Sequence, residues 1–127
     1  MPTLLSIIES SMHPNFGLLY HKLGFEEIIV NSIRKAISLL KNQQPDFIVA
    51  EFFYGYGNNY AGVNISNLDV LLSTLQTYSP HTKVIVIVEK SEYRHVDKLN
   101  ELFPIHAVLV YPAKETEMKE LLENNGL

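Results

Sequence analysis

The sequence predicts one α/β domain in which a doubly wound parallel sheet of five strands carries helices on both faces. Two observations predict this class. Short apolar segments rich in β-branched residues alternate strictly with amphipathic segments, and turn-forming Gly and Pro residues separate them. The chain has 127 residues, the usual size of one domain, so we expect residues 1–127 to fold around one core.

The composition excludes several functional classes. Apolar residues make up 46% of the chain and charged residues 19%, as in an ordinary globular protein. Because there is no cysteine, a disulfide framework, a thiolate metal site and a cysteine nucleophile are excluded. Neither a long apolar span nor a signal segment is present, so we expect a cytoplasmic protein without a membrane partner. A net charge of -4 argues against direct nucleic-acid binding.

The first predicted pair of strand and helix covers residues 4–24. Residues 4–8 are apolar except for Ser6, which is typical of a strand covered on both faces. A helix follows Pro14, and Gly24 ends it because glycine suits the left-handed turn after a helix. The apolar residues of this helix recur at helical spacing: Phe16, Leu19, Tyr20 and Leu23.

The next elements repeat this alternation. Residues 28–30 form a short predicted strand, and Asn31 or Ser32 caps the helix that follows. The apolar face of that helix comprises Ile33, Ala36, Ile37 and Leu40. Residues 47–53 are β-branched and aromatic, and they follow Pro45, which can begin a strand but cannot sit within a central ladder. They are predicted as the third strand.

Residues 54–67 are predicted as a loop, because glycine, asparagine and tyrosine dominate this segment. Ser66 or Asn67 is expected to cap a helix that begins near Leu68, and Ser79-Pro80 ends it. The apolar face of this helix comprises Leu71, Leu72 and Leu75.

The last part of the chain contains two more pairs of strand and helix. Residues 84–88 are all β-branched and give the clearest strand signal. Ser91 is expected to cap the fourth helix, which carries Val96, Leu99 and Phe103 and stops at Pro104. Residues 107–110 form the fifth predicted strand. Residues 114–123 form the fifth helix, with these residues inward: Met118, Leu121 and Leu122.

Two motifs in this arrangement point to a known family. The run from Pro45-Asp46 through apolar residues to Glu51, and the Tyr111-Pro112 step before the terminal helix, resemble the receiver domains of two-component response regulators. The resemblance covers essentially the whole chain. It implies a flavodoxin-like fold with strand order 2-1-3-4-5, in which chemistry collects at the carboxyl ends of the strands.

The resemblance also assigns positions to the functional groups of that family. There, an acidic pair binds magnesium, an aspartate accepts phosphate, and a Ser or Thr and a Lys-Pro step hold the phosphoryl group. In this sequence the acidic pair falls on Glu9 and Ser10, the acceptor on Glu51, the hydroxyl on Val88, and the Lys-Pro step on Tyr111 and Pro112.

These replacements imply a degenerate phosphoacceptor pocket, as in a pseudo-receiver. Only Glu9 remains of the acidic pair, so we expect at best weak Mg²⁺ binding through Glu9 and Glu51, and no other cofactor. Val88 has no hydroxyl, and Tyr111 offers a neutral phenol in place of an ammonium. The peptide bond from Tyr111 to Pro112 is a candidate cis bond.

Alternatives remain open for individual residues. Glu51 either imitates a permanently charged acceptor or takes a solvated or hydrogen-bonded place at the strand end. Tyr111 is expected to be a rim aromatic that fills the vacated pocket. Asp46 begins the third strand and is expected at the opposite end of the sheet from Glu51, so it is not expected to be an acceptor.

Other patterns carry no recognised chemistry. The glycines of residues 54–67 match neither the dinucleotide nor the P-loop pattern, so nucleotide binding is not expected. No serine has the flanking glycines of a nucleophile elbow, so an enzyme is not expected. The histidines lie on separate elements, without the spacing of a metal-binding pair, and each is predicted at the surface: His13, His21, His81, His95 and His106.

Together these observations predict a non-enzymatic signalling or protein-interaction module that is not phosphorylated. Its fourth and fifth helices carry mixed charges. They correspond to the face through which receiver domains commonly dimerise, so a homodimer through the fourth helix, fifth strand and fifth helix is expected as one partner arrangement. Two alternatives are a small-ligand sensor with a site under residues 54–67, and the N-terminal regulatory domain of a transcription factor.

Overall fold

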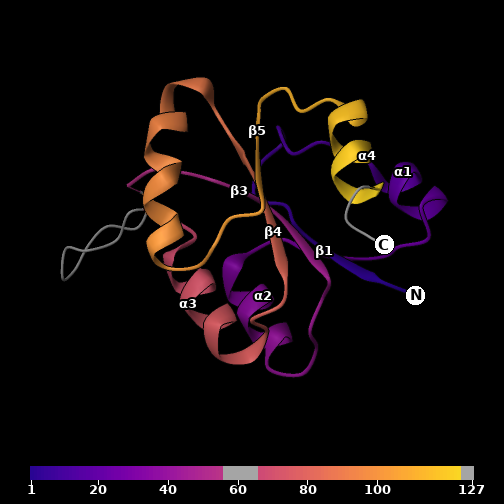
Figure 1. The fold of residues 1–127 in the computed structure, drawn as a ribbon, viewed down its shortest axis with the longest axis horizontal. Coiled ribbons are helices and arrows are strands. Elements are labelled where there is room, and N and C mark those ends of the chain that lie inside the picture. The colour runs from indigo at the N-terminus through magenta and orange to yellow at the C-terminus, as the bar shows by residue number, and fades with distance from the viewer. Residues whose placement is uncertain (56–65, 124–127) are drawn as a thin grey trace.

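The computed structural model describes residues 1–55 and 66–123. Strands and helices alternate along these residues, as Figure 1 shows. The elements are β1 Thr3–Ile7, α1 Gly17–Lys22, β2 Glu26–Val30, α2 Ile33–Leu40, β3 Phe47–Glu51, α3 Asp69–Tyr78, β4 Lys83–Val88, the 3₁₀ helix η1 Lys90–Glu101, β5 Ala107–Val110 and α4 Glu115–Glu123. The predicted fourth and fifth helices are therefore η1 and α4.

The strands of the described residues form one five-stranded parallel sheet with the order β2-β1-β3-β4-β5. This confirms the predicted fold class and strand order. Because β1 and β3 are parallel neighbours, their carboxyl ends are adjacent: Ile7 pairs with Ala50. The segments that follow these two strands therefore meet at the carboxyl end of the sheet, which is called the edge below.

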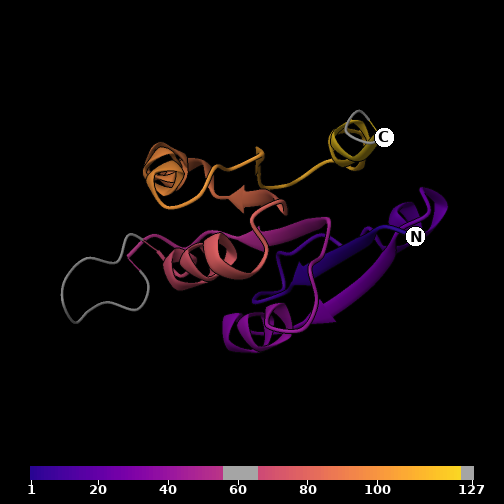
Figure 2. The ribbon, with the colours of Figure 1, turned by 60° about the horizontal axis from the view of Figure 1, so that its bottom comes forward.

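Helices cover both faces of the sheet, as the rotated view in Figure 2 shows. One apolar cluster joins α2, α3 and η1 to the sheet, and a second joins α1 and α4 to the other face. Adjacent residues of β3 illustrate the alternation, since Ile48 belongs to the first cluster and Val49 to the second. Both are completely buried, as expected for a strand covered on both sides.

The helix ends follow the predictions in part. Ser32 caps α2, where its hydroxyl accepts a 3.1 Å hydrogen bond from Lys35 N–H. Gly24 follows α1 with a φ of 88°, the left-handed conformation that glycine adopts without strain. Ser91 does not cap the fourth helix, which begins at Lys90 after Glu89 without a side-chain cap.

The predicted cap of the third helix is also wrong. The N-cap is Leu68, and its side chain makes no capping bond. The Ser66 side chain instead makes local hydrogen bonds. Its hydroxyl accepts from Leu68 N–H at 3.0 Å and donates to the Asp69 carboxylate at 3.1 Å. Asn67 turns its amide away from the helix, towards the ends of β1 and β3.

The predicted loop at residues 54–67 is described only at its two ends. Tyr54 and Ser66 form an isolated antiparallel bridge, and the Tyr54 ring stacks on His95 of η1 with 3.6 Å between ring centroids. Residues 56–65, and with them the predicted ligand site under the loop, lie outside the described residues. Among the residues described, no helix has the length and apolar character needed to span a bilayer.

Candidate functional site

Glu51 is the last residue of β3, and its side chain is fully buried, with 0% of its surface exposed. The preceding residue, Ala50, faces α2 and α3, so the alternation of the strand turns the Glu51 carboxylate towards the face that α1 and α4 cover. A carboxylate withdrawn from water is stable only when hydrogen bonds or a cation replace the solvent. The partners of Glu51 therefore decide the chemistry of this edge.

The segment after β1 wraps around the Glu51 carboxylate. The backbone N–H groups of Glu9 and Ser10 donate to Oε2 at 2.8 Å and 3.2 Å. The Ser10 hydroxyl donates to Oε1 and itself accepts a 3.1 Å bond from Met12 N–H, which fixes its orientation. The resemblance assigned Glu9 and Ser10 to a metal-binding pair, but here they contribute donors to Glu51.

Tyr111, directly after β5, supplies a further donor. Its hydroxyl lies 2.8 Å from Glu51 Oε1, and its backbone N–H donates to Val88 O at 3.0 Å. The bond between Tyr111 and Pro112 is cis, as predicted. Tyr111 therefore reaches from the edge strand to the end of β3.

His13 is the last partner of Glu51, and its predicted position at the surface is wrong. Its side chain is only 1% exposed, and Nδ1 lies 3.1 Å from Glu51 Oε2. Its other ring nitrogen, Nε2, is buried without a hydrogen-bond partner among the described residues. No periodic pattern in the sequence predicts the burial of His13, because His13 lies in the turn between β1 and α1. Its partner, Glu51, is 38 residues away.

Asn67 was expected only as a helix cap, yet it joins Glu9 to Glu51. Its Nδ2 donates to Glu9 Oε1 and to the Glu51 carbonyl, both at 2.8 Å. Its Oδ1 accepts a 2.7 Å bond from Phe53 N–H. The amide therefore fixes the chain just after β3 and holds the Glu9 side chain beside the same edge.

These contacts set the protonation states at the edge. Burial raises the pKa of Glu51, but hydrogen bonds from His13, Ser10, Glu9 N–H and Tyr111 outweigh it and lower the pKa to about 2. Burial and the bond to Glu51 raise the pKa of Tyr111, so its hydroxyl keeps the proton that it donates. Burial, together with the charge of Glu51, raises the pKa of Glu9, although the Asn67 bond opposes this.

The donor set does not fit the magnesium ion that the fold family implies. Within the described residues the Glu51 carboxylate already accepts five hydrogen bonds. Mg²⁺ takes oxygen ligands in a near-octahedral shell, so Glu51 would have to give up these donors to bind it. Among the residues described, no group of three or more acidic or histidine side chains is placed to hold a metal.

The remaining candidate residues lie apart from this hydrogen-bond network. Val88 is completely buried and packs in the apolar cluster of α2, α3 and η1, which is the face opposite the Glu51 carboxylate. Pro112 is exposed. Asp46 lies at the other end of β3, where its Oδ2 accepts a 2.8 Å bond from Thr3 N–H, as its position in the sequence predicted.

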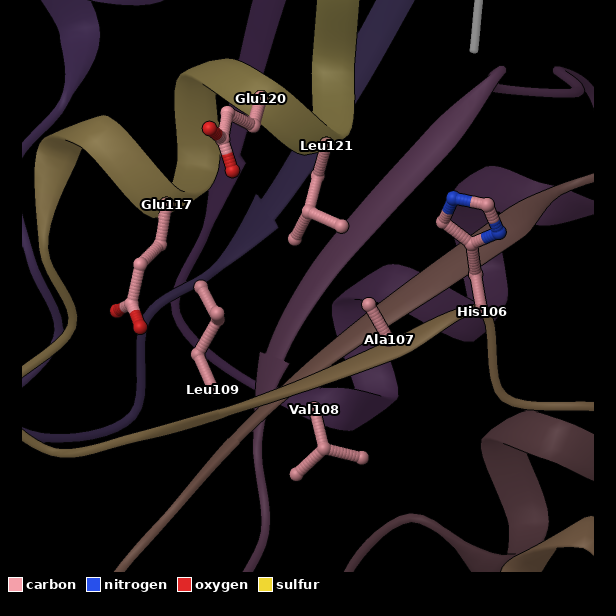
Figure 3. A pocket seen from close by; sticks show the side chains of 7 residues that line it. All are labelled: His106, Ala107, Val108, Leu109, Glu117, Glu120 and Leu121. Atoms are coloured by element: carbon pink, nitrogen blue, oxygen red, sulfur yellow. The ribbon is translucent and has the colours of Figure 1, made fainter. Parts of the chain in front are cut away.

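A second surface feature flanks β5, which has a strand neighbour on one side only within the described residues. Between β5 and α4 lies a pocket of about 370 Å³, into which Glu117 and Glu120 of α4 project opposite Ala107 and Leu109 (Figure 3). On the side of η1, an apolar pocket of about 430 Å³ is lined by Lys90, Tyr93, Arg94 and Val110. Two glutamates thus line the pocket on the α4 side of β5, and Lys90 and Arg94 line the apolar pocket on the η1 side.

Comparison with known proteins gives a fold but no family assignment. No family model matches the chain, and no curated protein matches it. A response regulator receiver domain from Methanospirillum hungatei has a TM-score of 0.74 at 10% identity, and the match covers 98% of this chain and 92% of that one. A response regulator from Thermotoga maritima has a TM-score of 0.71 at 16% identity, and the match covers 98% and 96%.

A third similar structure is described as a novel family of redox sensors in the streptococci that evolved from two-component response regulators. Its TM-score is 0.72 at 12% identity, and the match covers 98% of this chain but 50% of that one. At such identities these likenesses establish the fold alone. The chain has the architecture of receiver domains.

Proposed function

We propose that this chain is an atypical receiver domain, a non-enzymatic signalling or protein-interaction module that is not phosphorylated. The receiver-like fold supports the general role. One observation supports the specific proposal that the chain is not phosphorylated. The carboxylate at the acceptor position, Glu51, is fully buried, and donors from its own chain occupy both of its oxygens.

Three features argue against phosphoryl transfer to Glu51. An attacking oxygen must reach phosphorus in line, and cations must neutralise the charge of the transferred group. Glu51 is inaccessible, and the family's lysine position holds Tyr111, whose phenol stays neutral and bonds to Glu51. Val88 supplies no hydroxyl to hold a phosphoryl group and packs on the other face.

Incubation with acetyl phosphate and Mg²⁺, followed by intact-mass measurement, tests this proposal. We expect no acyl-phosphate adduct under conditions in which an aspartate-bearing receiver domain becomes fully labelled. An addition of beryllofluoride should likewise leave the amide resonances of Glu9, Ser10 and Glu51 unmoved. A stoichiometric adduct on Glu51 would overturn the proposal.

The partner that the surface fits best is a second copy of this chain, docked through η1, β5 and α4. In the described part of the chain, β5 lies between a pocket that Glu117 and Glu120 line and an apolar pocket that Lys90 and Arg94 line. A two-fold axis brings the η1 side of one copy to the α4 side of the other, so that Lys90 and Arg94 meet Glu117 and Glu120. This opposition of charge is what favours self-association over another protein.

Sedimentation velocity with charge-reversal variants tests the dimer. Arg94→Glu and Glu120→Arg should each shift the protein towards monomer, because like charges then face one another across the axis. An equimolar mixture of the two variants should recover the dimer, since each mismatched pair becomes complementary. A wild-type chain that stays monomeric at all concentrations, or a mixture that does not recover, would contradict this interface.

A second candidate function is a ligand sensor, favoured by the structural likeness to the streptococcal redox sensors. A thiol-based version is excluded, because the chain has no cysteine. A thermal-shift screen with nucleotides and metabolites tests it, since tight binding adds a few kcal/mol of stability. No stabilisation by any compound would remove this candidate.

A further inference from the structure

The groups around Glu51 form a lining of hydrogen-bond donors. Within the described residues the carboxylate accepts from two backbone N–H groups, a serine hydroxyl, a tyrosine hydroxyl and a histidine ring nitrogen. Convergent backbone and hydroxyl donors of this kind are what proteins place around small oxyanions. The lining comes from residues 9–13 and from Tyr111, while the carboxylate comes from β3.

The donors are held in position by contacts that do not involve Glu51. Ser10 accepts bonds from Met12 N–H and, through its carbonyl, from His13 N–H at 3.1 Å and 3.4 Å. The Tyr111 backbone is bonded to Val88, and Glu9 is bonded to Asn67. The lining therefore has its own support, and the carboxylate fills it as a ligand would.

We propose that this edge of the sheet is a carboxylate-binding site whose resident ligand is the side chain of Glu51. Because Glu51 is attached to β3, its carboxylate is present at a very high effective concentration and excludes free anions from the wild-type protein. Removal of the side chain by Glu51→Ala leaves an unoccupied lining. Acetate has the same heavy atoms as the methylene and carboxylate that this substitution removes, so acetate is the ligand that fits.

Equilibrium unfolding in sodium acetate and in sodium chloride of equal ionic strength tests the proposal. We expect Glu51→Ala to be stabilised by acetate in a saturable manner, with a dissociation constant on the order of millimolar, whereas the wild type responds alike to both salts. Calorimetric titration of the folded variant with acetate should give the same constant. Propionate, which is longer by one methylene, should bind more weakly.

Two kinds of control separate a specific site from a general salt effect. Asp46→Ala removes an exposed carboxylate at the opposite end of β3, and acetate should not rescue it. In the Glu51→Ala background, a further Tyr111→Phe or Ser10→Ala change removes one donor and should weaken acetate binding about tenfold. Equal responses of Glu51→Ala and Asp46→Ala, or unchanged affinity in the double variants, would overturn the proposal.

If Glu51→Ala does not fold in chloride, its refolding yield serves as the readout. Recovery in acetate but not in chloride supports the site, and equal failure in both salts contradicts it. The inference does not depend on the proposed interaction function. A failure of acetate rescue leaves the acetyl phosphate result untouched, and an acyl-phosphate adduct on the wild type leaves the acetate result untouched.

Discussion

The Tyr111 hydroxyl donates a 2.8 Å hydrogen bond to Glu51, although the two residues are 60 positions apart in the sequence. Glu51 ends β3, and Tyr111 follows β5, so the bond passes over the end of β4, which lies between these strands. Together with the bonds from Glu9 and Ser10, it joins the carboxyl ends of β1, β3 and β5. The Glu51 carboxylate thereby holds the carboxyl ends of these three strands together.

Tyr111→Phe tests the contribution of this bond to stability. Phenylalanine keeps the ring and removes the donor, so a buried carboxylate oxygen loses one partner. We expect the free energy of unfolding to fall by about 1–3 kcal/mol. Urea denaturation measures it. Tyr93→Phe, at a tyrosine that is 53% exposed, is the matched control and should change it by about 0.5 kcal/mol or less.

His13→Ala tests the missed partner of Glu51. The substitution removes the side-chain donor to Oε2 and opens a small cavity, so we expect a loss of about 2–4 kcal/mol in urea denaturation. His13→Asn should lose less, because the amide nitrogen of asparagine can occupy the position of Nδ1. His81 is exposed, and His81→Ala should be nearly neutral. A His13→Ala protein as stable as His81→Ala would contradict the assigned contact.

Acid should destabilise the protein through Glu51. The pKa of Glu51 is about 2 in the folded protein and 4.5 as its ordinary value, so its stabilisation is complete above about pH 4.5 and is lost as the pH falls towards 2. The difference corresponds to about 3 kcal/mol. Glu9 acts in the opposite direction, because its pKa is raised in the folded protein. Its contribution to stability is present below about pH 4.5 and is lost as the pH rises through the raised pKa.

Urea denaturation at a series of pH values measures this dependence. Glu51→Gln removes the titrating group and keeps the shape, so the variant should start from a lower stability at neutral pH and lose less on acidification. Parallel stability curves for wild type and variant between about pH 5 and pH 2 would show that Glu51 is not the group responsible.

Gly24→Ala tests the turn after α1. Gly24 has a φ of 88°, which is strained for any residue with a Cβ, so we expect a loss of about 1–2 kcal/mol in the free energy of unfolding. Gly17→Ala is the matched control. Gly17 has no positive φ, and its added Cβ would lie 3.4 Å from Glu27 Oε1, so thermal and urea unfolding should change little.

Much of the architecture was predictable because it depends on local patterns. The β-branched run at residues 84–88 became β4 because such residues pack well in a sheet that is covered on both sides. The Ser32 cap and the turn at Gly24 were predictable for the same reason, since each depends on neighbours within a few residues. The wrong caps, Ser91 and Ser66, had the right chemistry, but Ser91 lies inside its helix and the Ser66 hydroxyl accepts from Leu68 N–H before the next helix begins.

The candidate site was predictable only in its location. Parallel strands put residues 9–10, Glu51 and Tyr111 at the same edge, and the resemblance named these positions. His13 and Asn67 were not identified as site residues. A turn histidine and an asparagine before a helix have many possible partners, and nothing in their spacing selects Glu51.

The sequence alone therefore determined the order of the elements, their parallel arrangement and the side-chain types at Val88 and Tyr111, which are neither a hydroxyl-bearing residue nor a lysine. Periodicity and side-chain type decide these properties, and both can be read along the chain. The tertiary structure alone decided that Glu51 is buried, ionised and satisfied by donors up to 60 residues away. Desolvation and hydrogen bonding depend on distances in space, which sequence separation does not contain.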